Sequence, residues 1–409
     1  MPQPFVLDPA GADPDAEHRT LRAEGPAARV DVLGVTAWSV TDPDLLKRLL
    51  TSSDVSKDAR QHWPQFNDAI QTWPLALWVA VENMFTAYGQ DHRRLRRMVA
   101  PAFSARRVDA LKERVENIVA DLLDDLDKTE PGELADLREH FAYPLPIQVI
   151  GHLMGLPAGR REGFRAVVDG VFATTLTPEQ AAANTVALYA VLDDLIATRR
   201  ADPGDDMTSL LIAARDEDGD GSALSENELR DTLLLMISAG YETTVNLIDQ
   251  GITALLTHPE QLHNVRSGRA TWGDVVEETL RLEPAVKHLP MRFAVRDIPL
   301  PDGQVIAEGE AILASYAAAN RHPDWHGDSA DSFDVTRTAP GPEHLAFGYG
   351  AHFCLGAPLA RLEGAIAIRA FFDRFPHAEL AVPSGQLPRV PSLITNGHQH
   401  LPVRLQPAL

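Results

Sequence analysis

The residue with the most reactive side chain is Cys354, the only cysteine among 409 residues. It lies in the run HLAFGYGAHFCLGAPLARLE, where Gly348, Gly350 and Gly356 permit the tight turns that bring a backbone close to a flat ligand. A helix predicted to begin near Leu355 would point its free amides and positive dipole end at the sulfur and favour the thiolate. A thiolate serves as a metal ligand or as a nucleophile. An isolated intracellular cysteine is otherwise a small buried apolar residue, so its surroundings must decide.

A second candidate site interrupts the longest predicted helix. This helix begins at a capping box of Ser225 and Glu228 and is apolar almost all round, which predicts a buried position. The run 239–244, Ala-Gly-Tyr-Glu-Thr-Thr, breaks that pattern. Glycine inside a helix costs about 1 kcal/mol relative to alanine, and a buried carboxylate such as Glu242 costs more unless it is paired or hydrated. These residues fit either a glycine kink beside a capped acid or a functional site.

Basic residues gather in the stretch that follows residue 90. His92 and Arg96 stand four apart on one helix face, and Arg292 lies in a later segment predicted to be a strand. Guanidinium groups suit buried carboxylates because they donate forked hydrogen bonds. A larger basic patch surrounds the first pair in a chain of formal net charge −21 and predicts either a solvated face or a docking surface. The basic patch comprises Arg93, Arg94, Arg97, Arg106, Arg107 and Lys112.

The ten residues FGYGAHFCLG, from Phe347 to Gly356, resemble the haem-binding loop of the cytochrome P450 family at every defining position. The resemblance implies that the Cys354 thiolate is the axial ligand of the iron of haem b. It also implies that the propionates contact His92, Arg96, Arg292 and His352. The full set of implied cofactor-binding residues is His92, Arg96, Ala239, Gly240, Arg292, Phe347, Gly348, His352, Cys354 and Gly356.

The same resemblance assigns catalytic roles within the run 239–244, which is similar to the family's oxygen-binding segment. Ala239 and Gly240 would leave room above the haem. Thr243 would donate a hydrogen bond during oxygen activation, and Glu242 would relay protons from water.

Glu278 and Arg281, three apart on one helix face, are similar to the family's structural ion pair. The resemblance implies a role in folding and haem retention, with an acid or a histidine before the Cys loop as the third partner. The sequence does not assign that partner to a position. All these matches run from residue 92 to residue 356 in the order of the family.

The reaction implied by the resemblance is insertion of one oxygen atom of O₂ into a substrate C–H bond, with the other atom leaving as water. No Gly-x-Gly-x-x-Gly fingerprint follows a predicted strand. Electrons are therefore expected from a separate ferredoxin and its NAD(P)H-dependent reductase, which favours a docking surface over a solvated face for the basic patch. Two alternatives remain open: a Cys/His-type hydrolase or transferase that uses Cys354, and a non-catalytic haem-binding sensor.

The substrate pocket is expected, from the same resemblance, at Ala239, Val286, Leu289 and Ile394 and within the stretches 61–85 and 165–190. The named residues are apolar and of modest size, which favours a bulky, weakly polar small molecule. The pattern resembles actinobacterial members that hydroxylate macrolides or steroids.

The elements that must position these residues are mainly helices, with small β-sheets. Apolar periodicity predicts helices over 105–127, 180–199, 259–283 and 355–374 in addition to the helix from Ser225, and short strands after residue 290. No repeat or linker divides the chain, so we expect one domain over residues 1–409 with the cytochrome P450 fold and a long central helix across the haem.

The composition also excludes several classes. The net charge of −21 argues against a nucleic-acid binder. The N-terminus lacks the pattern of a signal peptide, and the apolar run 73–81 is too short to span a bilayer, so we expect a cytoplasmic protein without a membrane partner.

One motif resembles a calcium-binding loop. Asp216, Asp218, Asp220 and Gly221 have the spacing of such a loop, but Asn227 stands where a bidentate glutamate is needed. The sequence therefore predicts a solvated acidic loop without calcium.

Overall fold

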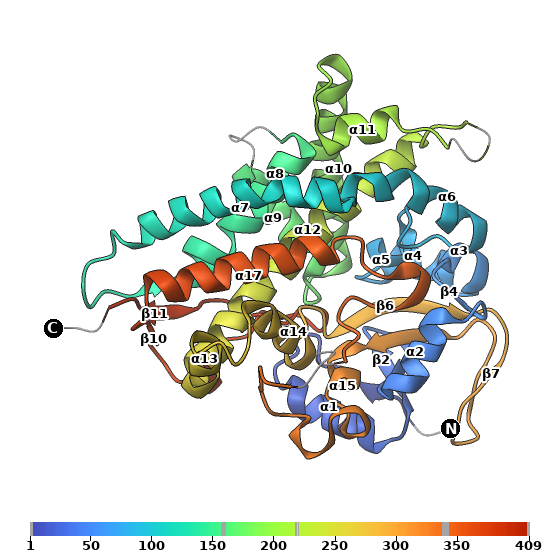
Figure 1. Cartoon of the computed structure of the whole chain (residues 1–409). Helices are drawn as coiled ribbons and strands as arrows, with labels where there is room; N and C mark the ends of the chain where they lie inside the picture. Colours follow the sequence, from blue (N-terminus) through green and yellow to red (C-terminus); the bar gives the residue numbers. More distant parts are fainter. Residues whose placement is uncertain (1–2, 157–160, 217–218, 220, 338–342, 407–409) are drawn as a thin grey trace.

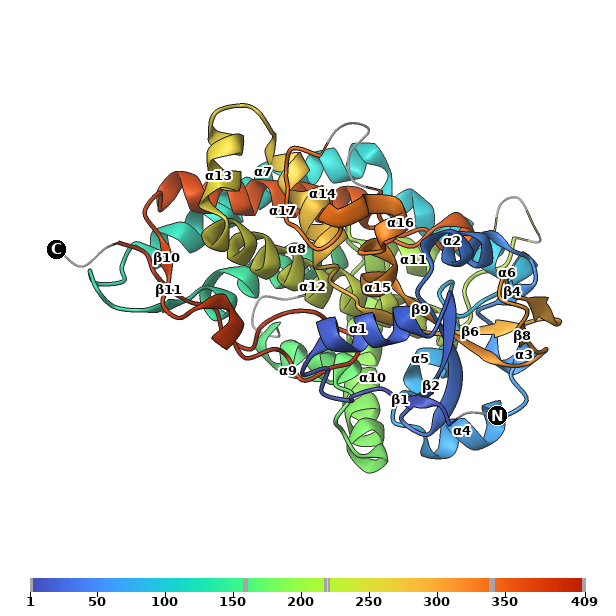
Figure 2. The ribbon, with the colours of Figure 1, turned by 90° about the horizontal axis from the view of Figure 1, so that it is seen from below.

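The computed structural model of the chain describes residues 3–156, 161–216, 219, 221–337 and 343–406. The long helices α7, α12 and α17 gather on one side of the molecule, and the largest sheet lies on the other side with α1 to α5 (Figures 1 and 2). The helices are α1 (Pro14–Ala23), α2 (Pro43–Thr51), α3 (Ala59–His62), α4 (Phe66–Thr72), α5 (Leu77–Ala80), α6 (Gly89–Val99), α7 (Ala105–Leu126), α8 (Pro144–Met154), α9 (Arg161–Phe172), α10 (Pro178–Ala201), α11 (Met207–Ala213), α12 (Glu226–Thr257), α13 (Pro259–Arg266), α14 (Trp272–Leu282), α15 (Tyr316–Asn320), α16 (Pro323–His326) and α17 (Ala357–Arg374). The strands are β1 (Phe5–Val6), β2 (Ala27–Val32), β3 (Val35–Val40), β4 (Val55–Ser56), β5 (Ala135–Asp136), β6 (His288–Ala294), β7 (Ile298–Pro299), β8 (Val305–Ile306), β9 (Ala311–Ser315), β10 (Glu379–Leu380) and β11 (Pro402–Arg404).

The central helix α12 confirms the prediction made from its capping box and apolar sequence. The Ser225 hydroxyl accepts from the Glu228 amide, and the Glu228 carboxylate accepts from the Ser225 amide. The helix runs for 32 residues through the helical side of the molecule and packs against α8, α9, α10, α14 and α17. Because it is surrounded, apolar residues are needed on nearly every face.

The helix predicted over 259–283 is two helices, α13 and α14. Gly268 lies between them with a left-handed φ of +75°, a conformation that ends a helix. A new capping box then forms between Thr271 and Asp274, whose side chain accepts from the Thr271 amide. The glycine therefore decided a boundary that apolar periodicity alone could not detect.

The largest sheet has the strand order β1-β2-β3-β9-β6-β4. The strand segments expected after residue 290 are present, but the expectation that β structure is confined to the C-terminal part was wrong. The hairpin β2–β3 near the N-terminus turns at Leu33 and Gly34, which both have positive φ. Leu33 is the one described non-glycine residue with positive φ, and Leu-Gly is not a common hairpin dipeptide, so the sequence carries only a weak sign of this turn.

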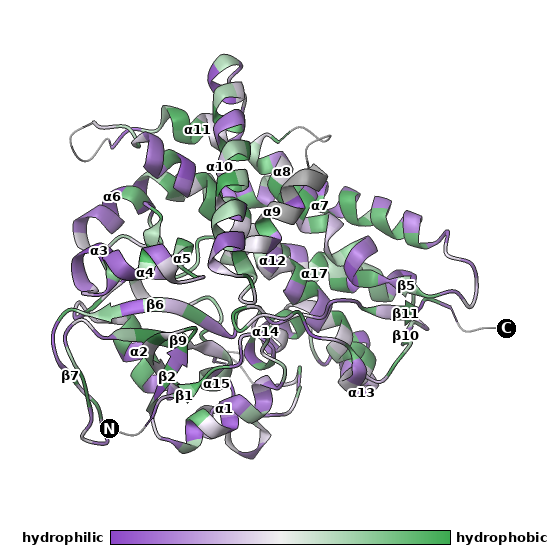
Figure 3. Cartoon of the chain, turned by 180° about the vertical axis from the view of Figure 1, so that it is seen from behind, coloured by the Kyte–Doolittle hydropathy of each residue, from purple (hydrophilic) through white to green (hydrophobic). Residues whose placement is uncertain are grey.

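The helix α10 is, among the described residues, the one helix long and apolar enough to cross a membrane by length and composition alone. This helix was predicted over residues 180–199, but not as a membrane-spanning segment. Its buried residues Leu188, Leu192, Leu195 and Ile196 face the protein, and it packs against α9, α11 and α12. Much of its other face is exposed and alanine-rich (Figure 3).

The residues that resemble a calcium loop lie only partly within the described chain. Asp218 and Asp220 lie outside it. Asp216 is buried, and its carboxylate accepts a hydrogen bond from Arg97 at 3.0 Å. The pairing with Arg97 accounts for this acid without a bound ion.

Candidate active site

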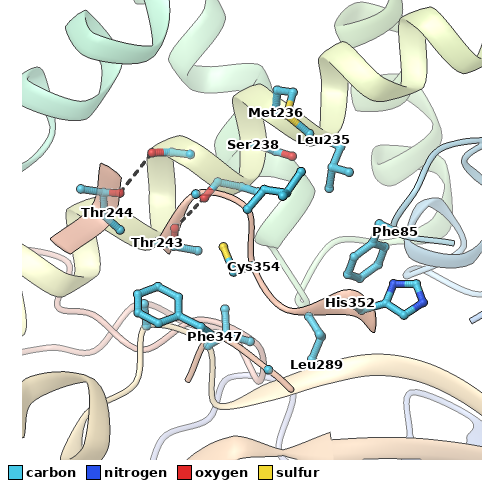
Figure 4. A pocket seen from close by; sticks show the side chains of 18 of the residues that line it. Phe85, Leu235, Met236, Ser238, Thr243, Thr244, Leu289, Phe347, His352 and Cys354 are labelled. Carbon is cyan, nitrogen blue, oxygen red and sulfur yellow. Dashed lines mark hydrogen bonds between the residues drawn. The ribbon is translucent and has the colours of Figure 1, made fainter. Parts of the chain in front are cut away.

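A large cavity separates α12 from the Cys354 loop. It measures about 1790 Å³, counting the part open to solvent, and its walls come from α5, α9, α12, β6 and the loop before α17. Figure 4 shows the Cys354 sulfur at this cavity with Thr243 on one side and Phe347 on the other. The chain thus brings together residues separated by more than 100 positions in the sequence.

The loop around Cys354 is held by its own backbone. The Cys354 amide donates to the Phe347 carbonyl at 3.0 Å, and Gly348, with φ +72°, donates to the Leu345 carbonyl at 2.8 Å. Burial raises the pKa of the Cys354 thiol, while the amides of Gly356 and Ala357 lower it. The amides therefore act in the predicted direction, and burial has the larger effect on the pKa.

The predicted anion-binding residues converge at one end of the cavity. The rings of His92 and His352 lie 4.1 Å apart, and Arg96, Arg292 and Lys57 lie close enough to lower the pKa of the His352 imidazole, which burial lowers most. Burial, followed by Arg96, lowers the pKa of His92 to about 4. Within the described chain none of these basic groups has a carboxylate partner.

Two atoms of this group show what it is built to hold. His92 Nε2 and Arg292 Nε are buried without a hydrogen-bond partner, and an unsatisfied buried donor is costly unless a ligand satisfies it. A ligand with two carboxylates would supply the missing acceptors and the missing negative charge. The propionates of haem have this chemistry, so the residues fit the group.

Lys57 is a member of this cluster that sequence reasoning missed. Its side chain is buried, Nζ donates to the Pro290 carbonyl at 3.0 Å, and it lies 3.7 Å from the centre of the Phe85 ring. Burial keeps the pKa of Lys57 well below its usual range. An isolated lysine in a loop carries no sequence signal for such a position.

The α12 residues opposite the sulfur are Ala239, Gly240 and Thr243. The Thr243 hydroxyl donates to the Ala239 carbonyl at 2.6 Å, which leaves its oxygen lone pairs free to accept from a group in the cavity (Figure 4). A Cβ on Gly240 would lie 2.7 Å from Ile150 Cδ1. A larger residue at position 240 would therefore require the Ile150 side chain on α8 to shift.

Glu242 does not line the cavity. Its Oε1 accepts from Arg138 Nη2 and from Asn246 Nδ2, each at 3.1 Å, on a buried side of α12. Burial raises the pKa of Glu242 to about 7, and Arg138 opposes the rise. The carboxyl therefore titrates near neutral pH, as a proton relay requires.

Arg138, which the sequence analysis did not single out, organises this buried region. It is fully buried in the π-helix η2 (Arg138–Ala142) and donates to Asp249 and Asn246, both at 2.9 Å. The imidazole of His398 lies 2.9 Å from the other oxygen of Asp249. One guanidinium thus compensates two buried carboxylates, those of Glu242 and Asp249.

The pair Glu278–Arg281 is buried and bidentate, with both N–O distances 2.8 Å. Its third partner is Arg337, whose Nε donates to Glu278 Oε1 at 2.9 Å. The expectation of an acid or a histidine was wrong. The Glu278 carboxylate can accept a further hydrogen bond, so the third partner is a donor and not an acceptor. Arg281 instead donates to the carbonyls of Ala330 and Ser332.

Of the expected substrate contacts, Ala239, Val286 and Leu289 line the cavity and Ile394 does not. Ile394 is fully buried in an apolar cluster beneath the sheet, and its backbone pairs with the Lys287 amide. The expected stretches 61–85 and 165–190 both contribute to the cavity wall, and three of the residues that they supply are aromatic. They are Trp78, Phe85 and Phe172, with Trp78 edge-on to both others.

Glu363 on α17 is another cavity residue that the sequence analysis missed. Its side chain is buried, its Oε2 has no hydrogen-bond partner, and burial raises its pKa to about 8. At pH 7 the neutral form of the Glu363 carboxyl is therefore favoured over the ionised form. A short helix pattern containing one glutamate gave no sign of this burial.

Comparison with known proteins agrees with this geometry. The family model described as cytochrome P450 matches residues 180–268 and 273–391. The 2-hydroxy-5-methyl-1-naphthoate 7-hydroxylase of Streptomyces carzinostaticus is 41% identical, over 98% of each chain. The 6-deoxyerythronolide B hydroxylase of Saccharopolyspora erythraea is 38% identical, over 94% of each chain. The structure of CYP154A1 from Streptomyces coelicolor A3(2) has 69% identity and a TM-score of 0.94, covering 98% of this chain and all of that one.

The chain belongs to the cytochrome P450 family. It is a haem-thiolate monooxygenase, and the single cysteine, Cys354, supplies the thiolate ligand of the iron. Bound haem supplies the oxygen activation that leads to hydroxylation. Family membership removes both alternatives, the Cys/His-type hydrolase and the non-catalytic sensor.

Proposed function

We propose that this enzyme hydroxylates a bulky, weakly polar substrate of the size of a steroid or a macrolactone. The observation that carries the proposal is the apolar part of the cavity wall. There Trp78, Phe85, Phe172, Val286 and Leu289 form an apolar surface. Few polar groups interrupt it, so a substrate gains binding energy mainly from apolar contact.

The names of two relatives support a large, ring-containing substrate. One relative is named for hydroxylation of a substituted naphthoate and the other for hydroxylation of 6-deoxyerythronolide B. The aromatic wall of Trp78, Phe85 and Phe172 suits a fused-ring compound especially well, because flat rings pack against aromatic edges and faces.

A ligand panel tests this proposal. We expect steroids, macrolactones and polycyclic aromatics to shift the spin state of the haem iron at micromolar concentration, and linear fatty acids of equal carbon count to shift it weakly. Absorption titration measures both. Preferential binding of the linear acids would contradict the proposal.

We assign roles to this chain's residues as follows. Arg96 and Arg292 bind the propionates through their positive charge, and Lys57, His92 and His352 donate hydrogen bonds to them. Thr243 accepts or donates a hydrogen bond in the cavity opposite the sulfur. Glu242 passes protons from the buried side of α12 toward the cavity.

We further propose that a ferredoxin delivers electrons at the sulfur side of the protein. Arg96 Nη2 donates to the Phe353 carbonyl at 2.7 Å, so the basic patch on α6 and α7 adjoins the Cys loop. Four of its members already have internal partners: Arg94 pairs with Glu228, Arg97 with Asp216, Arg107 with Asp205 and Lys112 with Glu116. Arg93 and Arg106 are exposed and have no ion pair within the described chain, which leaves them available to an acidic partner.

Reversing both free charges should weaken ferredoxin binding. In Arg93→Glu/Arg106→Glu we expect reduction by ferredoxin to slow at least about tenfold at low salt, with the gap closing at high salt because screening removes steering. Stopped-flow reduction measures the rate. Arg369→Glu, an exposed change on α17, is the control, and an equal loss in that variant would contradict the proposed surface.

A further inference from the structure

A cluster of nitrogen and oxygen donors lies outside the cavity, where α1 meets the start of β6. The donor atoms of Glu17, His18 and His288 all lie within 4.8 Å of one another. His288 Nε2 lies 3.2 Å from Glu17 Oε1, and the rings of His18 and His288 are 5.4 Å apart at 70°. None of these residues lines the cavity.

His18 is the feature of this cluster that packing does not explain. Its side chain is 3% exposed, and both Nδ1 and Nε2 lack a hydrogen-bond partner. Burying a polar group without a partner costs free energy, and native proteins rarely leave both nitrogens of an imidazole unsatisfied. A ligand held between His18 and its two neighbours would remove that cost.

The other two side chains are held in place by their own contacts. His288 Nδ1 lies 2.9 Å from the Ser315 hydroxyl, which directs Nε2 toward Glu17 and His18. The Asp8 amide donates to Glu17 Oε2 at 3.1 Å, which leaves Oε1 facing the histidines. Hydrogen bonds to the far atoms of ligating residues are the usual support of a metal site.

The ligand types of the cluster select among metal ions. Two imidazoles and one carboxylate suit zinc, whereas magnesium and calcium prefer sets of oxygen ligands.

We propose that Glu17, His18 and His288 bind one zinc ion, with water completing a tetrahedral site. The ion would join α1 to β6, the strand that carries Leu289 in the cavity wall and Arg292 in the basic cluster. It would thereby fix the N-terminal helix against the wall of the active site.

Zinc retention by the holoenzyme tests this proposal. We expect wild-type protein incubated with Zn²⁺ and gel-filtered to keep about one zinc per chain by elemental analysis. His18→Gln and Glu17→Gln should weaken zinc binding at least about tenfold in competition with a chromogenic chelator. Zinc should also raise the Tm of the wild type and not that of the variants.

The control is His322→Gln. His322 belongs to the other donor cluster, with Asp42 and Asp324, which is more exposed. This variant should keep the zinc. If His18→Gln fails to incorporate haem, the Glu17→Gln variant provides the test. Its amide oxygen can still accept from the Asp8 amide, so we expect this variant to fold. Wild-type protein that elutes without zinc, or a Glu17→Gln variant that keeps it, would overturn the proposal.

Discussion

The variant Arg138→Gln should unfold with a free energy about 3–5 kcal/mol lower than that of the wild type. The guanidinium of Arg138 is fully buried and contacts both Glu242 and Asp249. Glutamine removes the charge and leaves both carboxylates buried, with only His398 still beside Asp249. Chemical denaturation of the haem-containing protein, followed by circular dichroism, measures the loss.

This destabilisation should increase with pH. The pKa of Glu242 is raised from 4.5 to about 7 by burial, so its contribution to stability is fully present below pH 4.5 and is lost as the pH rises toward 7. Arg138 lowers this pKa, and removing it extends the unfavourable ionisation to higher pH. We therefore expect a larger difference between variant and wild type at pH 8 than at pH 5.

A surface ion pair provides the matched control. Arg369 contacts Asp373 at 3.2 Å with both side chains mostly exposed, so Arg369→Gln should cost about 0.5 kcal/mol or less. An Arg138→Gln variant as stable as Arg369→Gln, or one whose stability loss does not depend on pH, would show that the buried carboxylates do not depend on Arg138.

The second large effect is expected at Thr243. Thr243→Ala should consume NAD(P)H at a rate close to that of the wild type while forming several-fold less hydroxylated product. The hydroxyl is held by the Ala239 carbonyl at 2.6 Å with its lone pairs free, so the alanine variant loses a hydrogen-bonding group that faces the cavity opposite Cys354, while the basic patch proposed to bind the ferredoxin is untouched. Product formed per NAD(P)H oxidised, with peroxide release, measures the coupling.

Thr243→Ser separates the hydroxyl from the side-chain methyl group. Serine retains the hydroxyl, so coupling should recover toward that of the wild type, whereas a purely steric role for Thr243 predicts equal coupling in the alanine and serine variants. Unchanged coupling in Thr243→Ala would refute the assigned role.

Local sequence patterns predicted the parts of the site that are local in the chain. The loop from Phe347 to Gly356 and the capping box of Ser225 and Glu228 depend on neighbouring residues, so their spacing sufficed. The meeting of His92, Arg292 and His352 followed only from the family resemblance, since no spacing rule joins positions 200 residues apart.

The residues that were missed or misplaced have partners far away in sequence. Arg138 meets Asp249 across 111 positions, and Arg337 meets Glu278 across 59. Ile394 was expected in the cavity wall but lies in the core. In an irregular segment, a register shift of one residue decides whether a side chain faces the cavity or the core, and the sequence pattern does not fix that register. The hairpin at Leu33 and Gly34 was missed because its turn lacks the usual Asn-Gly or Asp-Gly pair.

The order of strands in the largest sheet has a consequence for synthesis on the ribosome. β3 pairs with β9 through Ala37 and Ala311, which are 274 positions apart, since 311 − 37 = 274. At about 5–20 residues per second, the N-terminal hairpin waits roughly 14–55 s for its neighbour to be translated. Its open edge carries Trp38 and Val40 during that time, so early chains are exposed to edge-to-edge association. Slower translation or removal of chaperones should therefore lower the yield of folded protein.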